Sequence, residues 1–141
     1  MKIKPEMVDY IRTMVKGDHE ANDRIEAELD AEGWDNFSTL LGAVFYYAVH
    51  RRLNAKATAG EIILFVAEMR AAAPSGSQID PTAAEELVRA ALDPSIDISL
   101  EPQMVGRTQG LAILHILSSP DVTNQELETL LGRAVDASNQ A

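Results

Sequence analysis

Signals that begin α-helices recur along this chain, and they constrain its fold more than any other feature. A Thr, Ser or Asp followed three residues later by Glu satisfies the free amide groups of a helix start. Boxes of this kind occur at Thr58–Glu61, Thr82–Glu85 and Thr123–Glu126, each followed by apolar residues at helical spacing. Proline also suits the first helical position, because its missing N–H has no partner to lose there. The prolines that fit this role are Pro5, Pro81 and Pro102.

These signals and the spacing of apolar residues predict an all-α chain. Strand signals are nearly absent, since only the segment Ile96–Leu100 alternates apolar and polar residues, and one strand cannot form a sheet alone. We interpret that segment as a loop that pins Ile96, Ile98 and Leu100 to the core. Helices are expected at residues 5–16, 19–32, 36–53, 59–73, 81–92, 102–118 and 124–137.

Three of the expected helices, at 36–53, 59–73 and 102–118, have wide apolar faces and should carry the core. A wide face indicates contact with several neighbouring elements. We therefore expect an irregular or orthogonal bundle of six or seven helices. In the helix at 59–73, the wide face consists of Ile62, Ile63, Phe65, Val66 and Met69.

The length of 141 residues corresponds to about one domain. The stretch from Ala73 to Gln78 is rich in turn residues and could divide the chain into two halves. However, a half of about 70 residues would not easily make a stable core unaided. We expect one domain over residues 1–141, with a loop near 73–79 inside it.

Composition narrows the classes of function. The chain has no cysteine, which excludes disulfides, a thiolate nucleophile and zinc or iron–sulfur sites built on thiolates. Its formal net charge of −10 disfavours binding to nucleic acids or to anionic membranes. The longest nearly apolar run, Leu40–Val49, is about half of what a membrane span needs. A soluble, cytoplasmic protein is expected.

The most distinctive local feature is the acidic segment from Asp18 to Asp35. It holds eight acids and one base, Arg24, for a local net charge of −7. Acids in the first turn oppose the positive end of the helix dipole, but acids near the other end cost a few tenths of a kcal/mol each. Such a cost without local compensation indicates a partner surface. The candidate partner-binding residues are Asp23, Glu26, Glu28, Asp30, Glu32, Trp34 and Asp35.

Two alternatives to a partner surface remain open. The acidic segment can be a solvated helix surface, and Trp34 can be a lid over the core rather than a binding anchor. Basic residues also close the third expected helix, where they complement its dipole. Ion pairs between them and the acidic segment would remove the main support for partner binding. These basic residues are His50, Arg51, Arg52 and Lys56.

Signatures of catalysis and metal binding are absent. The chain has no Gly-x-Ser-x-Gly elbow, no Walker loop, no Gly-x-Gly-x-x-Gly and no HExxH. His19 and Asp23 lie one helical turn apart, but two ligands are too few for a metal. The segment Asp93–Asp97 lacks the glycine and glutamate of a calcium loop. We expect no enzyme activity, no cofactor and no metal.

The leading hypothesis is therefore a non-catalytic protein-binding module that presents an acidic face to a basic protein. An immunity protein or antitoxin that masks a cationic toxin is one concrete version, because complementary fields steer such pairs together. One alternative is a homo-oligomeric structural protein, such as a homodimer, whose wide apolar helices are completed by a second copy. Another is a small-molecule or metal-dependent activity in a pocket between helices, around His50, Tyr46 and Tyr47.

Overall fold

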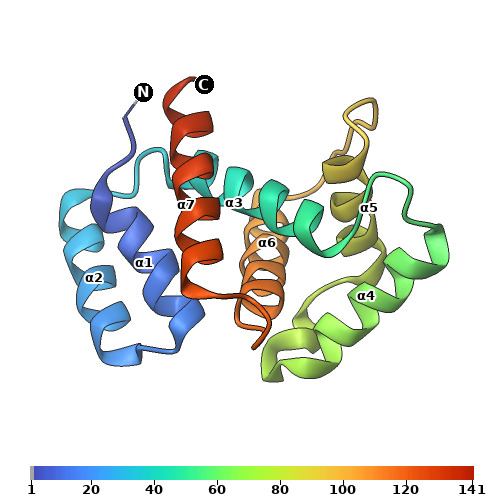
Figure 1. Cartoon of the computed structure of the whole chain (residues 1–141), viewed down its shortest axis with the longest axis horizontal. Coiled ribbons are helices and arrows are strands. Elements are labelled where there is room, and N and C mark those ends of the chain that lie inside the picture. The colour runs from blue at the N-terminus through green and yellow to red at the C-terminus, as the bar shows by residue number, and fades with distance from the viewer. Residues whose placement is uncertain (1) are drawn as a thin grey trace. The chain divides into compact units, whose positions relative to one another are not determined.

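The computed structural model describes residues 2–141, which form seven α-helices, one short 3-10 helix and no strand (Figure 1). The all-α prediction is confirmed, and each helix begins and ends within two residues of its expected position. The elements are α1 (Pro5–Lys16), α2 (His19–Glu32), α3 (Phe37–Arg52), α4 (Ala59–Ala72), η1 (Pro74–Gln78), α5 (Pro81–Leu92), α6 (Pro102–Leu117) and α7 (Asn124–Asn139).

The helix starts follow the capping signals, with one exception. Thr58 and Thr123 each cap a helix and complete the reciprocal box with the glutamate three residues on. The box expected at Thr82 is wrong, because Thr82 lies inside the first turn of α5. The cap is Asp80, whose carboxylate accepts a hydrogen bond from the Ala83 N–H at 3.0 Å. Since Pro81 takes the first helical position, the cap must be the residue before it.

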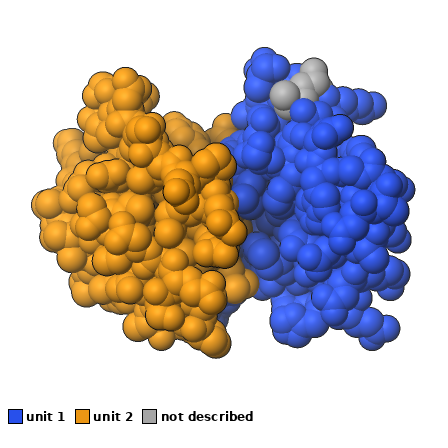
Figure 2. Space-filling model, turned by 180° about the vertical axis from the view of Figure 1, so that it is seen from behind, with its two compact units in different colours: residues 1–44, 117–141 blue, residues 45–116 orange. Residues whose placement is uncertain are grey.

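The helices fall into two compact units, coloured separately in Figure 2. The first contains the chain up to Val44 and from Leu117 onward, and the second contains Phe45–Ile116. The division runs through α3 and α6 rather than through the turn-rich loop. That loop is η1, which lies inside the second unit. The expectation of one domain over the whole chain stays a prediction.

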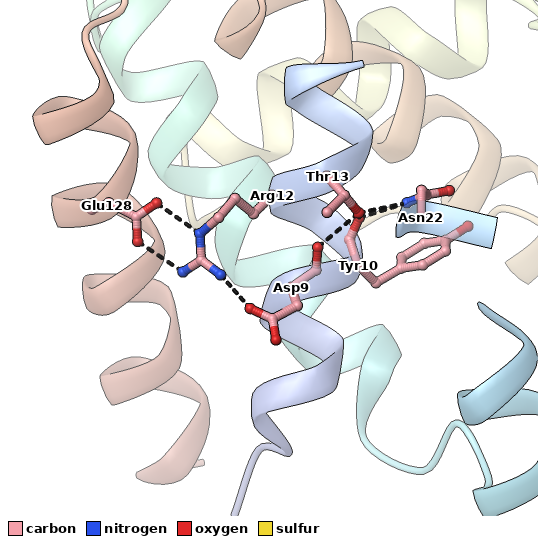
Figure 3. A network of polar contacts seen from close by, with 6 residues as sticks. All are labelled: Asp9, Tyr10, Arg12, Thr13, Asn22 and Glu128. Carbon is pink, nitrogen blue, oxygen red and sulfur yellow. Dashed lines mark hydrogen bonds and ion pairs between the residues drawn. The ribbon is translucent and has the colours of Figure 1, made fainter. Parts of the chain in front are cut away.

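In the first unit, α1 and α2 form an antiparallel pair, and α7 runs beside α1 (Figure 1). Polar contacts join the three helices, as Figure 3 shows. The Asn22 side-chain amide donates to the Tyr10 carbonyl at 2.8 Å, which ties α2 to α1. Arg12 binds Glu128 through two hydrogen bonds of 2.7 Å, which tie α1 to α7. The helices bury Met7, Ile11, Val15, Ile25, Leu29, Leu127, Leu130, Leu131 and Ala134 between them.

In the second unit, α4 and α5 pack together and η1 folds back onto α4. The Arg70 Nε donates to the Ile79 carbonyl at 2.8 Å, which ties the end of α4 to the segment after η1. Gly76 is buried against α4. The core of this unit includes Ile62, Phe65, Val66, Met69, Ile79, Ala84, Leu87, Val88 and Ile113.

The structure corrects two predictions about core residues. Ile63, expected on the buried face of α4, has 49% of its surface exposed. The period of 3.6 residues places Ile62, Val66 and Met69 on one side, so Ile63 turns outward. Ile96 and Ile98 are also exposed, in a segment between α5 and α6 that has no regular secondary structure. Only Leu100, the last residue of that segment, is half-buried.

The expectation that three wide helices carry the core also needs an addition. Buried residues do lie on α3, α4 and α6. However, α1 and α7 bury continuous stripes of their own, because they complete the core of the first unit.

Among the described residues, no helix has both the length and the apolar character that a membrane crossing requires.

Candidate protein-binding surface

Helix α2 carries most of the candidate binding residues, and two buried side chains fix its orientation. Ile25 and Leu29 point into the core of the first unit, Ala21 and Asn22 are half-buried, and the other residues of the helix are exposed. The helix begins at Asp18, whose carboxylate accepts a hydrogen bond from the Ala21 N–H at 3.3 Å. It ends at Gly33, whose φ of 110° suits glycine.

The five candidate carboxylates on α2 are all exposed. We call this group the acidic face of α2. Within residues 2–141, none of its members forms an ion pair. The last turn of the helix also contains no basic residue to offset the negative end of the dipole. The acidic face comprises Asp23, Glu26, Glu28, Asp30 and Glu32.

Trp34 lies directly beside the acidic face and is half-buried. Its indole Nε1–H donates to the Asp30 carboxylate at 2.7 Å. Its ring meets Tyr10 and Phe37 edge-on, with centroids 5.1 Å away in both cases. Trp34 thus covers the first unit with part of its ring while another part stays accessible.

Tyr10 is a member of this aromatic cluster that the sequence interpretation missed. The available signal was its position three residues after Met7, at the border of the apolar stripe of α1. Burial raises the pKa of its phenol, and the negative charges of Glu26, Asp30 and Asp23 raise it further. The field of the acidic face therefore reaches the aromatic cluster.

Asp35 is exposed and lies beyond the end of α2, in the turn that leads into α3. The next residue, Asn36, has a φ of 74°, a conformation that asparagine adopts more readily than most residues. The turn places Asp35 outside the helix that carries the other candidates. Six of the seven candidate residues thus lie on α2 and at Trp34 just after it, with the acids distributed around the exposed circumference of the helix, and Asp35 follows Trp34.

Arg52, at the end of α3, makes its contacts inside the second unit. Arg52 lies 3.6 Å from the Glu68 carboxylate and over the ring of Phe65. Lys56 is exposed, and Arg51 is half-buried. The Arg52 charge is therefore engaged by Glu68, a residue outside the acidic segment.

The aromatic residues of the alternative pocket hypothesis do come together. The Tyr46 and His50 rings lie 4.3 Å apart, and Tyr47 meets Tyr46 edge-on. His50 Nε2 lies 2.8 Å from the Ala91 carbonyl, which identifies that nitrogen as the donor. This bond gives His50 a structural role in joining α3 to α5.

No three His, Asp or Glu side chains among the described residues are arranged to hold a metal ion. His19 is exposed at the first position of α2.

No family model, no curated protein and no solved structure matches this chain.

Proposed function

We propose that this chain is a non-catalytic binding module that presents the acidic face of α2 to a basic protein. The observation that carries the proposal is the set of exposed carboxylates on α2, which form no ion pair within the described residues. Like charges placed one turn apart, near the negative end of the helix dipole, reduce the stability of the helix. A cationic partner would compensate that cost.

The distribution of charge supports the same proposal. The first unit has six basic and fourteen acidic residues, a net charge of −8, whereas the second has six and eight, a net charge of −2. A field concentrated on one unit attracts a basic protein and speeds its association. We infer that the partner binds the first unit.

Trp34 adds a source of affinity beside the charges. Tryptophan is enriched among the residues that contribute most to binding energy, and such residues lie near the centre of an interface. Its bond to Asp30 and its packing on Tyr10 hold the ring in one orientation. A module of this type suits an immunity protein or antitoxin that covers the cationic surface of a toxin.

The test is affinity capture from the native lysate at low and moderate salt. The test variant carries Glu26→Gln, Glu28→Gln and Glu32→Gln. Asp30 is left unchanged because it holds the Trp34 indole. The matched control carries Asp97→Asn, Glu101→Gln and Asp136→Asn, three exposed acids outside α2, so both variants lose the same amount of negative charge.

We expect wild type and the control to retain the same basic protein, and the α2 variant to lose it. Purified partner should then bind wild type with an affinity that falls as salt is added, because exposed charges are screened. Equal retention by all three proteins would contradict the proposal, and so would equal loss by both variants.

A further inference from the structure

The outer face of α4 is apolar and lies in the second unit. It consists of five exposed residues without a charge among them, and it includes the two most exposed large aliphatic side chains within residues 2–141. Ile63 has 49% and Leu64 has 60% of its surface exposed. A surface helix of a monomeric protein normally places polar residues on this side. The outer face of α4 comprises Gly60, Ile63, Leu64, Ala67 and Ala71.

Charged residues border this face, and the two borders differ in sign. At roughly 100° per residue, Glu61 and Glu68 fall on one side of the face and Arg70 falls on the other. The bond from Arg70 Nε to the Ile79 carbonyl holds the guanidinium at its border. Within residues 2–141, the Glu68 carboxylate pairs only with Arg52, at 3.6 Å, which leaves it able to accept a second cation.

We propose that the outer face of α4 binds a second copy of this chain, with the two α4 helices parallel about a two-fold axis. In that arrangement the acidic border of each helix meets the basic border of the other, so that Glu68 lies near Arg70 of the second copy. The pairing occurs twice, as a two-fold interface requires. Ile63 of each copy then lies beside Leu64 of the other.

Charge and residue size both favour a second copy over a different occupant. The second unit has a net charge of only −2, so two copies repel each other weakly at this face. A basic protein would be drawn to the first unit, where the net charge is −8. Gly60, Ala67 and Ala71 are small, which lets two helix backbones approach closely. This dimer is independent of the proposed binding of a basic protein by α2.

The first test is the mass of the whole chain in solution, by sedimentation equilibrium over a wide concentration range. One helix face is smaller than the roughly 800 Å² per partner of a standard interface, so we expect a weak dimer that dissociates within this range. Leu64→Glu should remove the dimer over the whole range. Ile96→Glu, at another exposed apolar residue of the same unit, should leave it intact.

The second test uses the absence of cysteine from the chain. In a parallel pair, residues at the centre of the outer face approach their own counterparts. Ala67→Cys and Ala71→Cys should therefore each form a disulfide-linked dimer under mild oxidation. Ala137→Cys, exposed on α7, should remain unlinked.

Each of several results would overturn the proposal. These are a wild type that is monomeric at every concentration, a Leu64→Glu variant that still dimerises, and crosslinking at only one of the two α4 positions. Crosslinking of Ala137→Cys as fast as Ala67→Cys would do the same. Circular dichroism of each variant shows whether the helices are retained, so that loss of the dimer is distinguished from unfolding.

Discussion

Gly76 lies so close to Arg70 that a Cβ atom added to it would be 1.7 Å from the Arg70 carbonyl oxygen. The obstacle is backbone at the end of α4, which cannot rotate away as a side chain can. Glycine is therefore the only residue that lets η1 fold back onto α4 without moving the helix. The relationship explains how a turn-rich segment packs against α4 within the second unit.

Gly76→Ala should accordingly destabilise the second unit. We expect the free energy of unfolding in urea to fall by about 3 kcal/mol or more, because the clash forces the backbone apart. Gly132→Ala in α7 is the control, since a Cβ there meets nothing within 4 Å. It should raise stability by roughly 0.5–1 kcal/mol, as alanine favours helix interiors. Equal stability of the two variants would contradict the packing described for Gly76.

Asp80→Ala and Thr82→Ala test which residue caps α5. Asp80→Ala removes the acceptor of the Ala83 N–H and should cost about 1 kcal/mol of stability. Thr82→Ala should be neutral or slightly stabilising, because Thr82 is exposed within the first turn and alanine is the better helix former. Urea denaturation measures both. A larger loss for Thr82→Ala would restore the capping box predicted from the sequence.

The ion pair between Arg12 and Glu128 should make stability depend on pH. The hydrogen bonds from Arg12 lower the pKa of Glu128 below its ordinary value of 4.5. Its contribution is therefore present above that value and is lost as the pH falls through the lowered one. Because the Glu128 side chain is 45% exposed, we expect Glu128→Gln to cost less than about 1 kcal/mol at neutral pH.

Denaturation of wild type and Glu128→Gln over a pH series checks this expectation. The difference between the two proteins should shrink as the pH falls below 4.5 and close once the pH has fallen through the lowered pKa of Glu128, where the carboxylate is protonated in both states. The control is Asp136→Asn. It changes an exposed acid of the same helix that forms no ion pair in the described part of the chain. A difference that persists at acid pH would show that Glu128 stabilises α7 by packing rather than by charge.

The pKa of Tyr10 should depend on the negative charges of the acidic face. Its pKa is raised from 10.0 first by burial and then by Glu26, Asp30 and Asp23. The stability associated with its neutral phenol is thus present below pH 10.0 and is lost as the pH rises through the folded pKa.

The Tyr10 titration midpoint, followed by NMR of its ring, should fall in Glu26→Gln. The midpoint should nevertheless stay above 10.0, because burial is the larger cause. The control Asp136→Asn, which removes a charge that does not contribute to the Tyr10 pKa, should leave the midpoint unchanged. A midpoint that is the same in wild type and Glu26→Gln would show that the field of α2 does not reach the aromatic cluster.

Helix positions were predictable from the sequence because the capping residues act locally. Thr58, Thr123 and the prolines satisfy or avoid backbone donors within one turn, so their effect is visible without tertiary structure. The cap of α5 was predicted wrongly because two cap signals, Asp80 and Thr82, lie two residues apart and only Pro81 decides between them.

Tertiary placement was less predictable. Ile63 and Leu64 sit in a helix that is apolar on nearly every side, so periodicity could not show which side faces outward. Gly76 reads as an ordinary turn residue, because its constraint comes from Arg70, six residues earlier in the chain. The contact of Tyr10 with Trp34 joins residues of α1 and of the segment after α2, and no local pattern encodes it.

The position of Trp34 also has a spectroscopic consequence. It is the single tryptophan of the chain, and it lies among aromatic side chains of the first unit. Its fluorescence therefore follows the melting of that unit, whereas the helical circular dichroism signal is summed over both. Comparing the two signals during denaturation reveals whether the units unfold in one cooperative step or in succession, and the protein needs no added label for the measurement.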